Sequence, residues 1–506
     1  MPETPDGTVS SLRPAHPRAR ALTDLLALLP ALRPAEGAAR PDSVRVTGAT
    51  LDSRAVQPGD LYAALPGSRA HGADFGAQAL TAGATAVLTD AEGVARLGAD
   101  VAVPVLVADD PRAVLGEVAR WVHGDPGAGM LLLGVTGTNG KTTTAFLLEA
   151  GLRAAGHRTG LLGTVLTRIG DDVVPSVRTT PEAPDVQALL ALMRERGTTA
   201  VALEVSSHAL TLGRVDGVCF DVAAFTNLSQ DHLDFHPTMQ AYEAAKATLF
   251  TPERSRRAVV NVDDPAGRRL TRSAGVPLVT YGEDADWQAH EVDLRGDGSS
   301  FRLTGPGVDV RASVRLPGEF NVANAVAAVA VLVTAGVPVE DAVRGVADLP
   351  GVPGRMERVD AGQDFLAVVD YAHTPDAVSR LVEAVRAVTT GRVLLVLGCG
   401  GDRDRSKRPL MGRAAAAADV AVLTSDNPRS EDPEAILAAM AGGAPDAQRE
   451  PDRRTAIAFA VQQARTGDAV VVAGKGHETG QEVAGTVHPF DDRVVLRDLL
   501  RARQAT

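Results

Sequence analysis

The chain has 506 residues, too many for one hydrophobic core because single cores stop growing at roughly 250 to 300 residues, so we expect three domains. A hydrophobic fraction of 45% and a charged fraction of 23% are typical of a folded, water-soluble protein. The net charge of -12 opposes binding to nucleic acid or anionic lipid, which excludes both as expected partners, and we expect no membrane insertion. Two cysteines, Cys219 and Cys399, suit packing in a reducing compartment, and we expect a monomeric, cytoplasmic protein.

The first 20 residues are rich in Pro, Ser and Arg without apolar periodicity, which predicts a flexible tail. Arginines precede an apolar run at 22–32, as in a secretory signal. Asp24 and Pro30 interrupt that run, which favours an amphipathic helix over a signal peptide. Residues 21–126 then carry short strand-like runs between glycines and prolines and predict an N-terminal domain.

At Met130 the pattern changes to strand, Gly-rich loop and helix, which indicates a parallel sheet covered by helices. A hairpin predicted at 300–316 and a long, mostly buried helix at 319–336 complete this central domain, placed at 127–350. Further buried strands are predicted at 199–205, 222–228 and 257–262.

A Pro/Gly-rich stretch at 349–355 predicts a linker, because such residues interrupt regular structure. Beyond it, residues 351–506 alternate strands with helices again, which predicts a second doubly wound α/β unit. Its strands are predicted at 365–371, 392–398, 420–426 and 469–475.

Residues 136–144 have the sequence TGTNGKTTT between a predicted strand and a predicted helix, where free backbone N–H groups and the helix N-terminus favour an anion. Lys141 supplies a positive charge for the outer phosphates of a nucleotide, and Thr142 or Thr143 can offer a hydroxyl to Mg²⁺. Val135 occupies the position of the first glycine in the strict phosphate-loop pattern. The pattern alone therefore leaves open a glycine turn that only precedes a helix.

This loop closely resembles the phosphate loop of the Mur ligase family, which includes folylpolyglutamate synthases, and the resemblance covers nearly the whole chain after the tail. It implies an α/β architecture of three domains: a UDP-substrate-binding domain (21–126), a P-loop-type ATP-binding domain (127–350) and a Rossmann-like amino-acid-binding domain (351–506). It implies ATP as co-substrate, with a carboxylate activated as an acyl phosphate that an amine displaces to form an amide. The implied ATP contacts in the loop are Gly137, Thr138, Asn139, Gly140, Lys141, Thr142 and Thr143.

Three side chains outside the loop are candidates for the reacting centre. Glu204 ends a predicted strand, at the sheet edge where α/β proteins place ligands, although strand-end acids are common. The segment 225–236 matches the family's TNLxxDHLDxH motif, which implies that His232, rather than His236, contacts a second Mg²⁺. By pattern alone Lys246 is a solvated helix lysine, whereas the resemblance implies that it is carbamylated and offers Mg²⁺ an anionic oxygen.

The resemblance thus implies two Mg²⁺ ions and an N6-carboxylysine at position 246. The implied metal ligands are Thr143, Glu204, His232 and carbamylated Lys246, and the implied catalytic residues are Lys141, Glu204, His232 and Lys246.

Asn321 and Asn324 lie three residues apart on one face of a predicted helix, although Asn is also a common helix cap. In the family this helix lies near adenine. The resemblance further implies that Arg355 reaches ATP phosphate and that the segment from Asp370 to His373 covers ribose and base after the third domain closes. Closure would keep water away from the acyl phosphate.

The acceptor site is predicted from two domains, although composition alone would make its first-domain residues ordinary loop residues. The residues that match family positions for the UDP-linked muramoyl-peptide are Ser53, Arg54 and His71 in the first domain, and Thr179, Thr180, Ser206 and Arg214 in the second. The planar fork of Arg214 suits the acceptor's carboxylates. Leu212 departs from the family, whose members can carry a polar residue there.

Residues 426–429 have the sequence DNPR after a predicted strand, which is also ordinary turn chemistry. In the family DNPR is associated with meso-diaminopimelate, and lysine-adding relatives usually carry a different motif. meso-Diaminopimelate has a second ammonium-carboxylate end that lysine lacks, and a bidentate arginine pairs with that carboxylate. The implied diaminopimelate contacts are Arg403, Asp426, Asn427, Pro428, Arg429, Gly474 and Glu478.

The resemblance therefore implies ATP-dependent ligation of meso-diaminopimelate to UDP-N-acetylmuramoyl-L-alanyl-D-glutamate, a step of peptidoglycan synthesis, with small molecules as partners. One alternative is a lysine-adding or folate-polyglutamate ligase, against which DNPR and the UDP-type first domain argue. The other is a non-catalytic, nucleotide-dependent scaffold. The joint presence of Lys141, Glu204, His232 and Lys246 argues against a scaffold, which has no need for all four.

Overall fold

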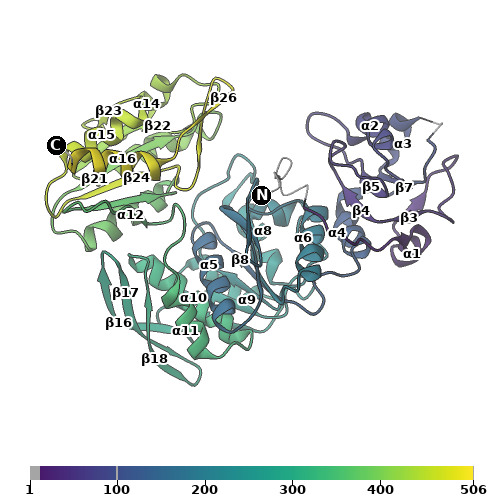
Figure 1. The fold of residues 1–506 in the computed structure, drawn as a ribbon, viewed down its shortest axis with the longest axis horizontal. Coiled ribbons are helices and arrows are strands. Elements are labelled where there is room, and N and C mark those ends of the chain that lie inside the picture. Colours follow the sequence, from purple (N-terminus) through teal and green to yellow (C-terminus); the bar gives the residue numbers. More distant parts are fainter. Residues whose placement is uncertain (1–11, 99–100, 505–506) are drawn as a thin grey trace.

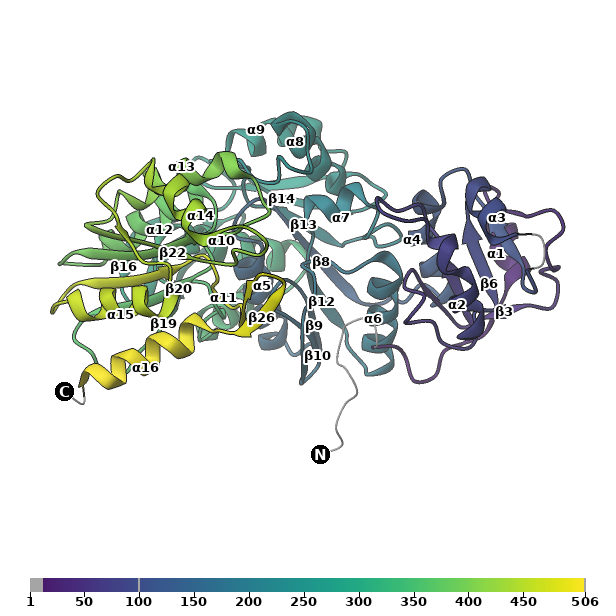
Figure 2. The ribbon, with the colours of Figure 1, turned by 90° about the horizontal axis from the view of Figure 1, so that it is seen from above.

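The computed structural model describes residues 12–98 and 101–504. Three α/β units follow one another along an elongated molecule, with the N-terminal and C-terminal units at opposite ends and the central unit between them (Figures 1 and 2). The predicted tail lies outside the described residues up to residue 11, and the domain boundaries chosen from the sequence stay predictions. Within the described residues, no helix combines the length and the apolar character needed to cross a membrane.

The N-terminal unit is built on a five-stranded sheet of order β2-β7-β6-β5-β4, parallel except for β2. The strands are β1 (Arg20–Ala21), β2 (Arg33–Pro34), β3 (Arg45–Val46), β4 (Gly48–Thr50), β5 (Asp60–Ala63), β6 (Ala86–Thr89) and β7 (Val105–Val107). The helices are α1 (Leu22–Leu28), η2 (Gly72–Phe75), α2 (Gly76–Thr81), α3 (Ala91–Leu97) and α4 (Pro111–Val122). Helix α1 confirms the predicted amphipathic helix, since Leu22 and Leu25 are fully buried.

The described part of the predicted tail differs from a flexible segment. Arg13 pairs with Asp60 at 2.7 Å, and the backbone N–H groups of Ala15 and His16 donate to the carboxylate of Glu195 in the central unit. Asp60 is 1% exposed, and a buried carboxylate is costly without a partner. The pairing therefore holds residues 12–20 in place, and hydrophobic periodicity could not reveal it.

The central unit contains an eight-stranded sheet of order β11-β10-β9-β12-β8-β13-β14-β15, in which β10 runs antiparallel to both of its neighbours, β9 and β11. Its strands are β8 (Leu131–Thr136), β9 (Thr159–Leu162), β10 (Leu166–Ile169), β11 (Asp172–Pro175), β12 (Ala200–Glu204), β13 (Val222–Phe225), β14 (Ala258–Asn261) and β15 (Leu278–Tyr281). Its helices are α5 (Lys141–Ala154), α6 (Ala183–Glu195), α7 (Ser207–Thr211), α8 (Met239–Ala247), η3 (Thr248–Phe250), α9 (Pro265–Ser273), α10 (Glu319–Thr334) and α11 (Val339–Asp348).

A separate three-stranded antiparallel sheet, β16-β17-β18, precedes α10. Its strands are β16 (Gln288–Arg295), β17 (Gly298–Gly305) and β18 (Val308–Val314). The pair β17-β18 confirms the predicted hairpin. The sequence did not indicate β16, because most of its side chains face solvent and it has no apolar alternation.

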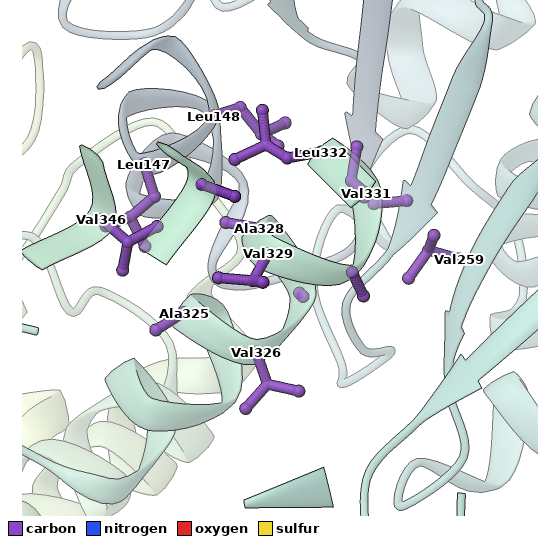
Figure 3. Packing of buried hydrophobic residues seen from close by; sticks show 14 of the residues in the cluster. Leu147, Leu148, Val259, Ala325, Val326, Ala328, Val329, Val331, Leu332 and Val346 are labelled. Carbon is purple, nitrogen blue, oxygen red and sulfur yellow. The ribbon is translucent and has the colours of Figure 1, made fainter. Parts of the chain in front are cut away.

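Helix α10 is the centre of the main core, as its apolar sequence predicts. It is hydrophobic on nearly all sides, and such a helix is stable only when it is covered on all sides. Figure 3 shows Ala325, Ala328 and Val329 of this helix packed toward Leu147 of α5 and Val346 of α11. This packing fixes α5, and with it the loop that precedes α5, against the sheet.

The C-terminal unit has a six-stranded sheet of order β19-β20-β24-β21-β22-β23, parallel except for β19. Its strands are β19 (Glu357–Arg358), β20 (Leu366–Asp370), β21 (Val393–Cys399), β22 (Val420–Ser425), β23 (Gln448–Arg449), β24 (Ala469–Ala473) and the hairpin β25 (Gly480–Val483) and β26 (Thr486–Pro489). Its helices are α12 (Pro375–Ala387), η4 (Arg405–Lys407), α13 (Arg408–Ala415), α14 (Pro433–Ala441), α15 (Arg453–Gln463) and α16 (Asp492–Gln504).

A fully buried ion pair fixes the ends of two strands in this unit. Arg453 binds both carboxylate oxygens of Asp492 at 2.7 Å, and neither side chain is exposed. The same guanidinium donates to the backbone carbonyls of Ser425 at 3.2 Å and Ala473 at 2.9 Å, the last residues of β22 and β24. The pair therefore anchors the two loops that follow these strands.

Replacing Asp492 by Ala leaves the Arg453 charge buried without its partner, and we expect the free energy of unfolding to fall by about 3–5 kcal/mol. Urea denaturation followed by circular dichroism measures this change. Asp309→Ala, which removes an exposed partner of Arg302, is the matched control and should cost at most about 1 kcal/mol. Equal small losses in both variants would contradict the anchoring role.

Candidate active site

The phosphate-loop segment joins β8 to α5 at the carboxyl edge of the central sheet. Gly140 has a φ of 86°, and a Cβ there would lie 2.5 Å from Asn324 Oδ1, so only glycine fits. Val135 is still inside β8 and fully buried, which explains why no glycine is needed at that position. The open alternative of a bare glycine turn is disfavoured, because the loop approaches α10 closely and lines a cavity.

Two lysines converge on one carbonyl oxygen of this loop. Lys141 Nζ and Lys246 Nζ each donate to the Gly137 carbonyl at 2.8 Å, and Lys141 also donates to that of Thr138. Lys246 is 1% exposed and lies over the Tyr242 ring, so the interpretation as a solvated lysine is wrong. Burial, together with the charge of Lys141, holds the Lys246 pKa well below its ordinary value.

Glu204 ends β12 with a fully buried side chain. Its carboxylate accepts hydrogen bonds from the Thr164 backbone N–H at 2.8 Å, from the Thr164 hydroxyl at 2.9 Å and from the Thr142 hydroxyl at 2.9 Å. Arg355, from the C-terminal unit, donates to the same Thr142 hydroxyl at 3.1 Å. The Thr142 hydroxyl thus links the Glu204 carboxylate of the central unit to the Arg355 guanidinium of the C-terminal unit.

His232 and His236 occupy different environments. His232 has a φ of 54° and contacts Asp231 at 3.4 Å, and burial lowers its pKa to about 4, so the imidazole is neutral at neutral pH with a lone pair available. His236 is 3% exposed and hydrogen-bonded to Ser207 at 3.0 Å. His232 lines the cavities described next, which fits the preference for His232 over His236.

A cavity of about 270 Å³ lies between the central and C-terminal units. The predicted ATP-contact residues that line it are Thr138, Asn139, Gly140, Lys141, Thr142, Thr143, Asn321, Asn324, Arg355, Asp370 and His373. Asn324 donates to Asn321 at 3.1 Å, and Asn321 donates to the Pro317 carbonyl at 2.8 Å, so both are oriented residues rather than free caps. The phosphate loop and the hydroxyl, amide and charged side chains of this lining suit a nucleotide.

Asp370 differs from the other residues of this set, because both of its oxygens accept backbone N–H groups, from Met356 and Ala372, at 2.7 Å. It orders the turn that brings Arg355 and His373 to the cavity. Burial raises the Asp370 pKa.

A larger cavity of about 960 Å³ adjoins the first, and the two share Thr179, Ser206, Asp231, His232, Tyr371 and His373. Its lining includes predicted acceptor residues of the central unit and predicted diaminopimelate residues of the C-terminal unit: Thr179, Thr180, Ser206, Arg214, Arg403, Asp426, Asn427, Arg429, Gly474 and Glu478. The two sets were predicted separately, and the fold brings them into one space. Arg214 pairs with Glu182 at 2.9 Å, and burial lowers its pKa.

The amino-acid end of the large cavity is held by a hydrogen-bond network. Asn427 donates to Glu478 at 2.9 Å, and the fully buried Lys475 donates to both, at 3.1 Å to Asn427 and 2.8 Å to Glu478. Arg429, with a φ of 56°, donates to the Gly401 carbonyl at 2.7 Å and contacts Glu482 at 3.5 Å. Lys475 is not among the residues predicted from the sequence, although its place between Gly474 and Glu478 in GKGHE was a usable signal.

Six predicted residues do not line these cavities: Gly137 and Lys246, which are hydrogen-bonded to each other, and four others. Ser53 donates to Gln78, and Arg54 pairs with Asp52, both within the N-terminal unit. His71 caps η2 and contacts Asp90 at 3.1 Å, so its side chain is held by contacts within the N-terminal unit. The fourth, Pro428, packs its backbone carbonyl against Gly401.

Across residues 12–98 and 101–504, no group of three or more His, Cys, Asp and Glu side chains is arranged to hold a metal ion on its own. Glu204 and His232 come from separate elements that line the small cavity. A metal here would need further oxygen ligands from hydroxyls, a modified lysine or a bound phosphate.

Family comparisons match each of the three units. Models described as Mur ligase middle domain, as Mur ligase, glutamate ligase domain, and as Mur ligase family, catalytic domain match residues 135–332, 354–476 and 45–122, respectively. The chain belongs to the Mur ligase family. These matches confirm the resemblance to this family that the sequence motifs indicated.

Individual Mur ligases resemble the chain over almost its whole length. A protein of Streptomyces avermitilis named UDP-N-acetylmuramoyl-L-alanyl-D-glutamate--2,6-diaminopimelate ligase is 56% identical, over 97% of this chain and 98% of that protein. A solved structure with the same name is 36% identical with a TM-score of 0.66, over 92% of this chain and 97% of that chain. A MurF ligase from Thermotoga maritima in complex with ADP shares the fold, at 18% identity and a TM-score of 0.64, over 91% and 98% of the two chains.

Lys475→Met removes both donated hydrogen bonds and leaves Glu478 without its cationic partner. We expect the free energy of unfolding to fall by about 1–3 kcal/mol, the usual cost of unsatisfied buried partners. Urea denaturation gives the value. An unchanged midpoint would show that Asn427 and Glu478 hold their positions without the lysine.

Proposed function

We propose that this Mur ligase joins meso-diaminopimelate to UDP-N-acetylmuramoyl-L-alanyl-D-glutamate at the expense of ATP, by way of an acyl phosphate. The observation that carries the proposal is the pair of adjoining cavities, one lined by the phosphate loop and one by DNPR and Arg214. Their shared walls would let a carboxylate, a phosphoryl group and an amine meet in one place. A monomeric state and a cytoplasmic location remain predictions.

Mg²⁺ is part of the proposal, and the residues present fit it. Mg²⁺ is usually held by one or two carboxylates together with substrate phosphates, rather than by a complete protein cage. Glu204 supplies a buried carboxylate that is hydrogen-bonded to the Thr142 hydroxyl, and Thr143 and neutral His232 line the same cavity. When bound, Mg²⁺ would neutralise charge on the phosphates.

The chemistry of Lys246 also supports a modified ligand. Its lowered pKa leaves the amine neutral more readily than an ordinary lysine, and a neutral amine attacks CO₂ to give a carbamate and release a proton. The carbamate would place anionic oxygens near Gly137. We propose Lys246 as N6-carboxylysine and, with Thr143, Glu204 and His232, as a metal ligand.

The side chains of the protein then act mainly by binding and orienting the substrates. Lys141 and the backbone N–H groups of the loop would hold the outer phosphates of ATP, and Arg355 would approach the transferred phosphoryl group beside Thr142. The acceptor carboxylate would attack the γ-phosphorus, with ADP as the leaving group. The diaminopimelate amine would then attack the acyl carbon, lose a proton and expel phosphate.

The amino-acid preference is assigned to the C-terminal unit. Arg403 and Arg429 line the large cavity, and Arg429 presents a planar fork that suits the distal carboxylate of meso-diaminopimelate. Lysine has no such carboxylate and would make no bidentate pair with Arg429, which favours its rejection. A lysine-adding ligase is the second candidate, since the reaction centre would be the same.

Arg429→Lys keeps the charge but removes the fork, and we expect kcat/KM for meso-diaminopimelate to fall by on the order of 100-fold. Phosphate release at varied amino-acid concentration measures it, and calorimetry with ADP measures nucleotide binding, which should be unchanged. Arg449→Lys, an exposed arginine on β23, is the control and should behave as the native chain does. A parallel loss of ADP affinity in Arg429→Lys would contradict an amino-acid-specific role.

Lys246→Arg cannot form a carbamate and should lose nearly all turnover. The native chain in CO₂-free buffer should lose activity and recover it when bicarbonate is added. ¹³C NMR with labelled bicarbonate should show a carbamate signal that is absent in Lys246→Arg. Full activity without CO₂ and without such a signal would remove the modification from the mechanism.

A further inference from the structure

Glu182, at the start of α6, contacts two arginines that line the acceptor side of the large cavity. Arg178 and Arg214 belong to the lining, and Glu182 does not. Glu182 Oε1 accepts a hydrogen bond from Arg178 at 2.6 Å and pairs with Arg214 Nη2 at 2.9 Å. Glu182 therefore holds two side chains of the cavity wall without being part of that wall.

The second oxygen of this carboxylate faces an arginine of the N-terminal unit. Arg112 Nη1, from the first turn of α4, lies 3.5 Å from Glu182 Oε2. The same nitrogen donates to the Leu212 carbonyl at 3.3 Å, two residues before Arg214. Arg112 thus contacts both the carboxylate that holds Arg214 and the loop that carries it.

Helices α4 and α6 pack against each other across the two units (Figure 1). Gly116 of α4 comes so close to the loop after α7 that a Cβ would lie 2.3 Å from the Asp216 carbonyl oxygen. At the far ends of the two helices, Arg194 of α6 donates to the carbonyls of His123 and Gly124, at 2.9 and 3.1 Å. The contact of Arg112 with Glu182 is the part of this interface that reaches the large cavity.

The local structure leaves the Glu182 side chain available for the arginines. Glu182 is the N-cap residue of α6, but its side chain makes no capping hydrogen bond. Pro184, at the second position of the helix, has no N–H, so one of the groups that an N-cap side chain usually accepts from is missing.

Arg214 is held on two sides. Nη2 pairs with Glu182, and Nη1 donates to the Thr180 carbonyl at 3.3 Å. Two fixed nitrogens set the plane of the guanidinium, and a set plane favours bidentate binding of a carboxylate. A guanidinium has five N–H donors, so these two contacts leave donors for an anionic ligand.

We propose that Glu182 is a positioning residue for the acceptor: it orients Arg214 for the acceptor's carboxylates and joins it, through Arg112, to the N-terminal unit. The inference rests on the proposed function, in which Arg214 binds the acceptor. Without the Glu182 carboxylate, three guanidiniums of like charge would lose the anion that they share, and Arg214 would lose one of the two contacts that set its plane.

The test is the steady-state kinetics of Glu182→Gln, which keeps the size of the side chain and removes its charge. We expect KM for UDP-N-acetylmuramoyl-L-alanyl-D-glutamate to rise on the order of 10-fold to 100-fold, with kcat and the KM values for ATP and meso-diaminopimelate within about threefold of the native values. Arg112→Gln should raise the acceptor KM in the same direction by a smaller factor.

Two variants are matched controls and should behave as the native chain does. Glu243→Gln removes a carboxylate of the central unit that pairs with Arg269 outside both cavities. Arg120→Gln removes another arginine of α4, one that pairs with Glu117 of the same helix.

A double variant tests whether Glu182 acts through Arg214. Arg214→Gln alone should raise the acceptor KM at least as much as Glu182→Gln does. Adding Glu182→Gln to it should then have much less effect than in the native chain, because residues that act through one contact are not additive. Full multiplication of the two effects would overturn the inference.

An unchanged or lowered acceptor KM in folded Glu182→Gln would also overturn it, as would equal rises in all three KM values, and the proposed function would stand in each case. If Glu182→Gln does not fold, Arg112→Gln and Arg120→Gln decide, and equal acceptor KM values in these two would overturn the inference. A native chain without turnover of meso-diaminopimelate would instead overturn the proposed function, and acceptor affinities from calorimetry on the same variants would then decide the role of Glu182.

Discussion

The buried carboxylate of Glu204 is the constraint on which the site depends. A charge with no exposure is tolerated only when hydrogen bonds replace the water it has lost. Thr142 and Thr164 provide those bonds, so the start of α5 and the loop after β9 must both come to the end of β12. Once Thr142 is fixed, the phosphate loop is fixed, and Arg355 of the other unit has a partner. Arg355 thus connects the C-terminal unit to a residue that holds Glu204.

Two doubly wound sheets face each other with their carboxyl edges, the edges at which such sheets bind ligands. The central sheet contributes Glu204 and the segment of His232, and the C-terminal sheet contributes the loops after β22 and β24. The Arg453–Asp492 pair fixes the strand ends from which those two loops begin. This arrangement explains why the reaction centre and the amino-acid site come from different domains and still adjoin.

Much of this architecture could be predicted from the sequence, because buried parallel strands are short apolar runs and α10 is apolar on nearly all sides. The phosphate loop could also be recognised from the sequence, because a glycine-rich segment with Lys141 between a predicted strand and a predicted helix is typical of an anion-binding site. Contacts between segments distant in sequence could not be predicted, namely Arg13 with Asp60, Lys475 with Asn427 and His71 with Asp90. Strand β16 was missed because its side chains face solvent. The burial of Lys246 was indicated by family resemblance and not by pattern, because its helix has the polar spacing of a surface helix.

The central claim is that one space receives an activated carboxylate and the amine of a specific amino acid. The most direct measurement incubates the protein with ATP, Mg²⁺ and UDP-N-acetylmuramoyl-L-alanyl-D-glutamate, and with either meso-diaminopimelate or L-lysine, and follows phosphate release and product mass. The account predicts phosphate release and the UDP-linked tripeptide with meso-diaminopimelate, and little of either with lysine. Turnover with lysine alone would contradict it.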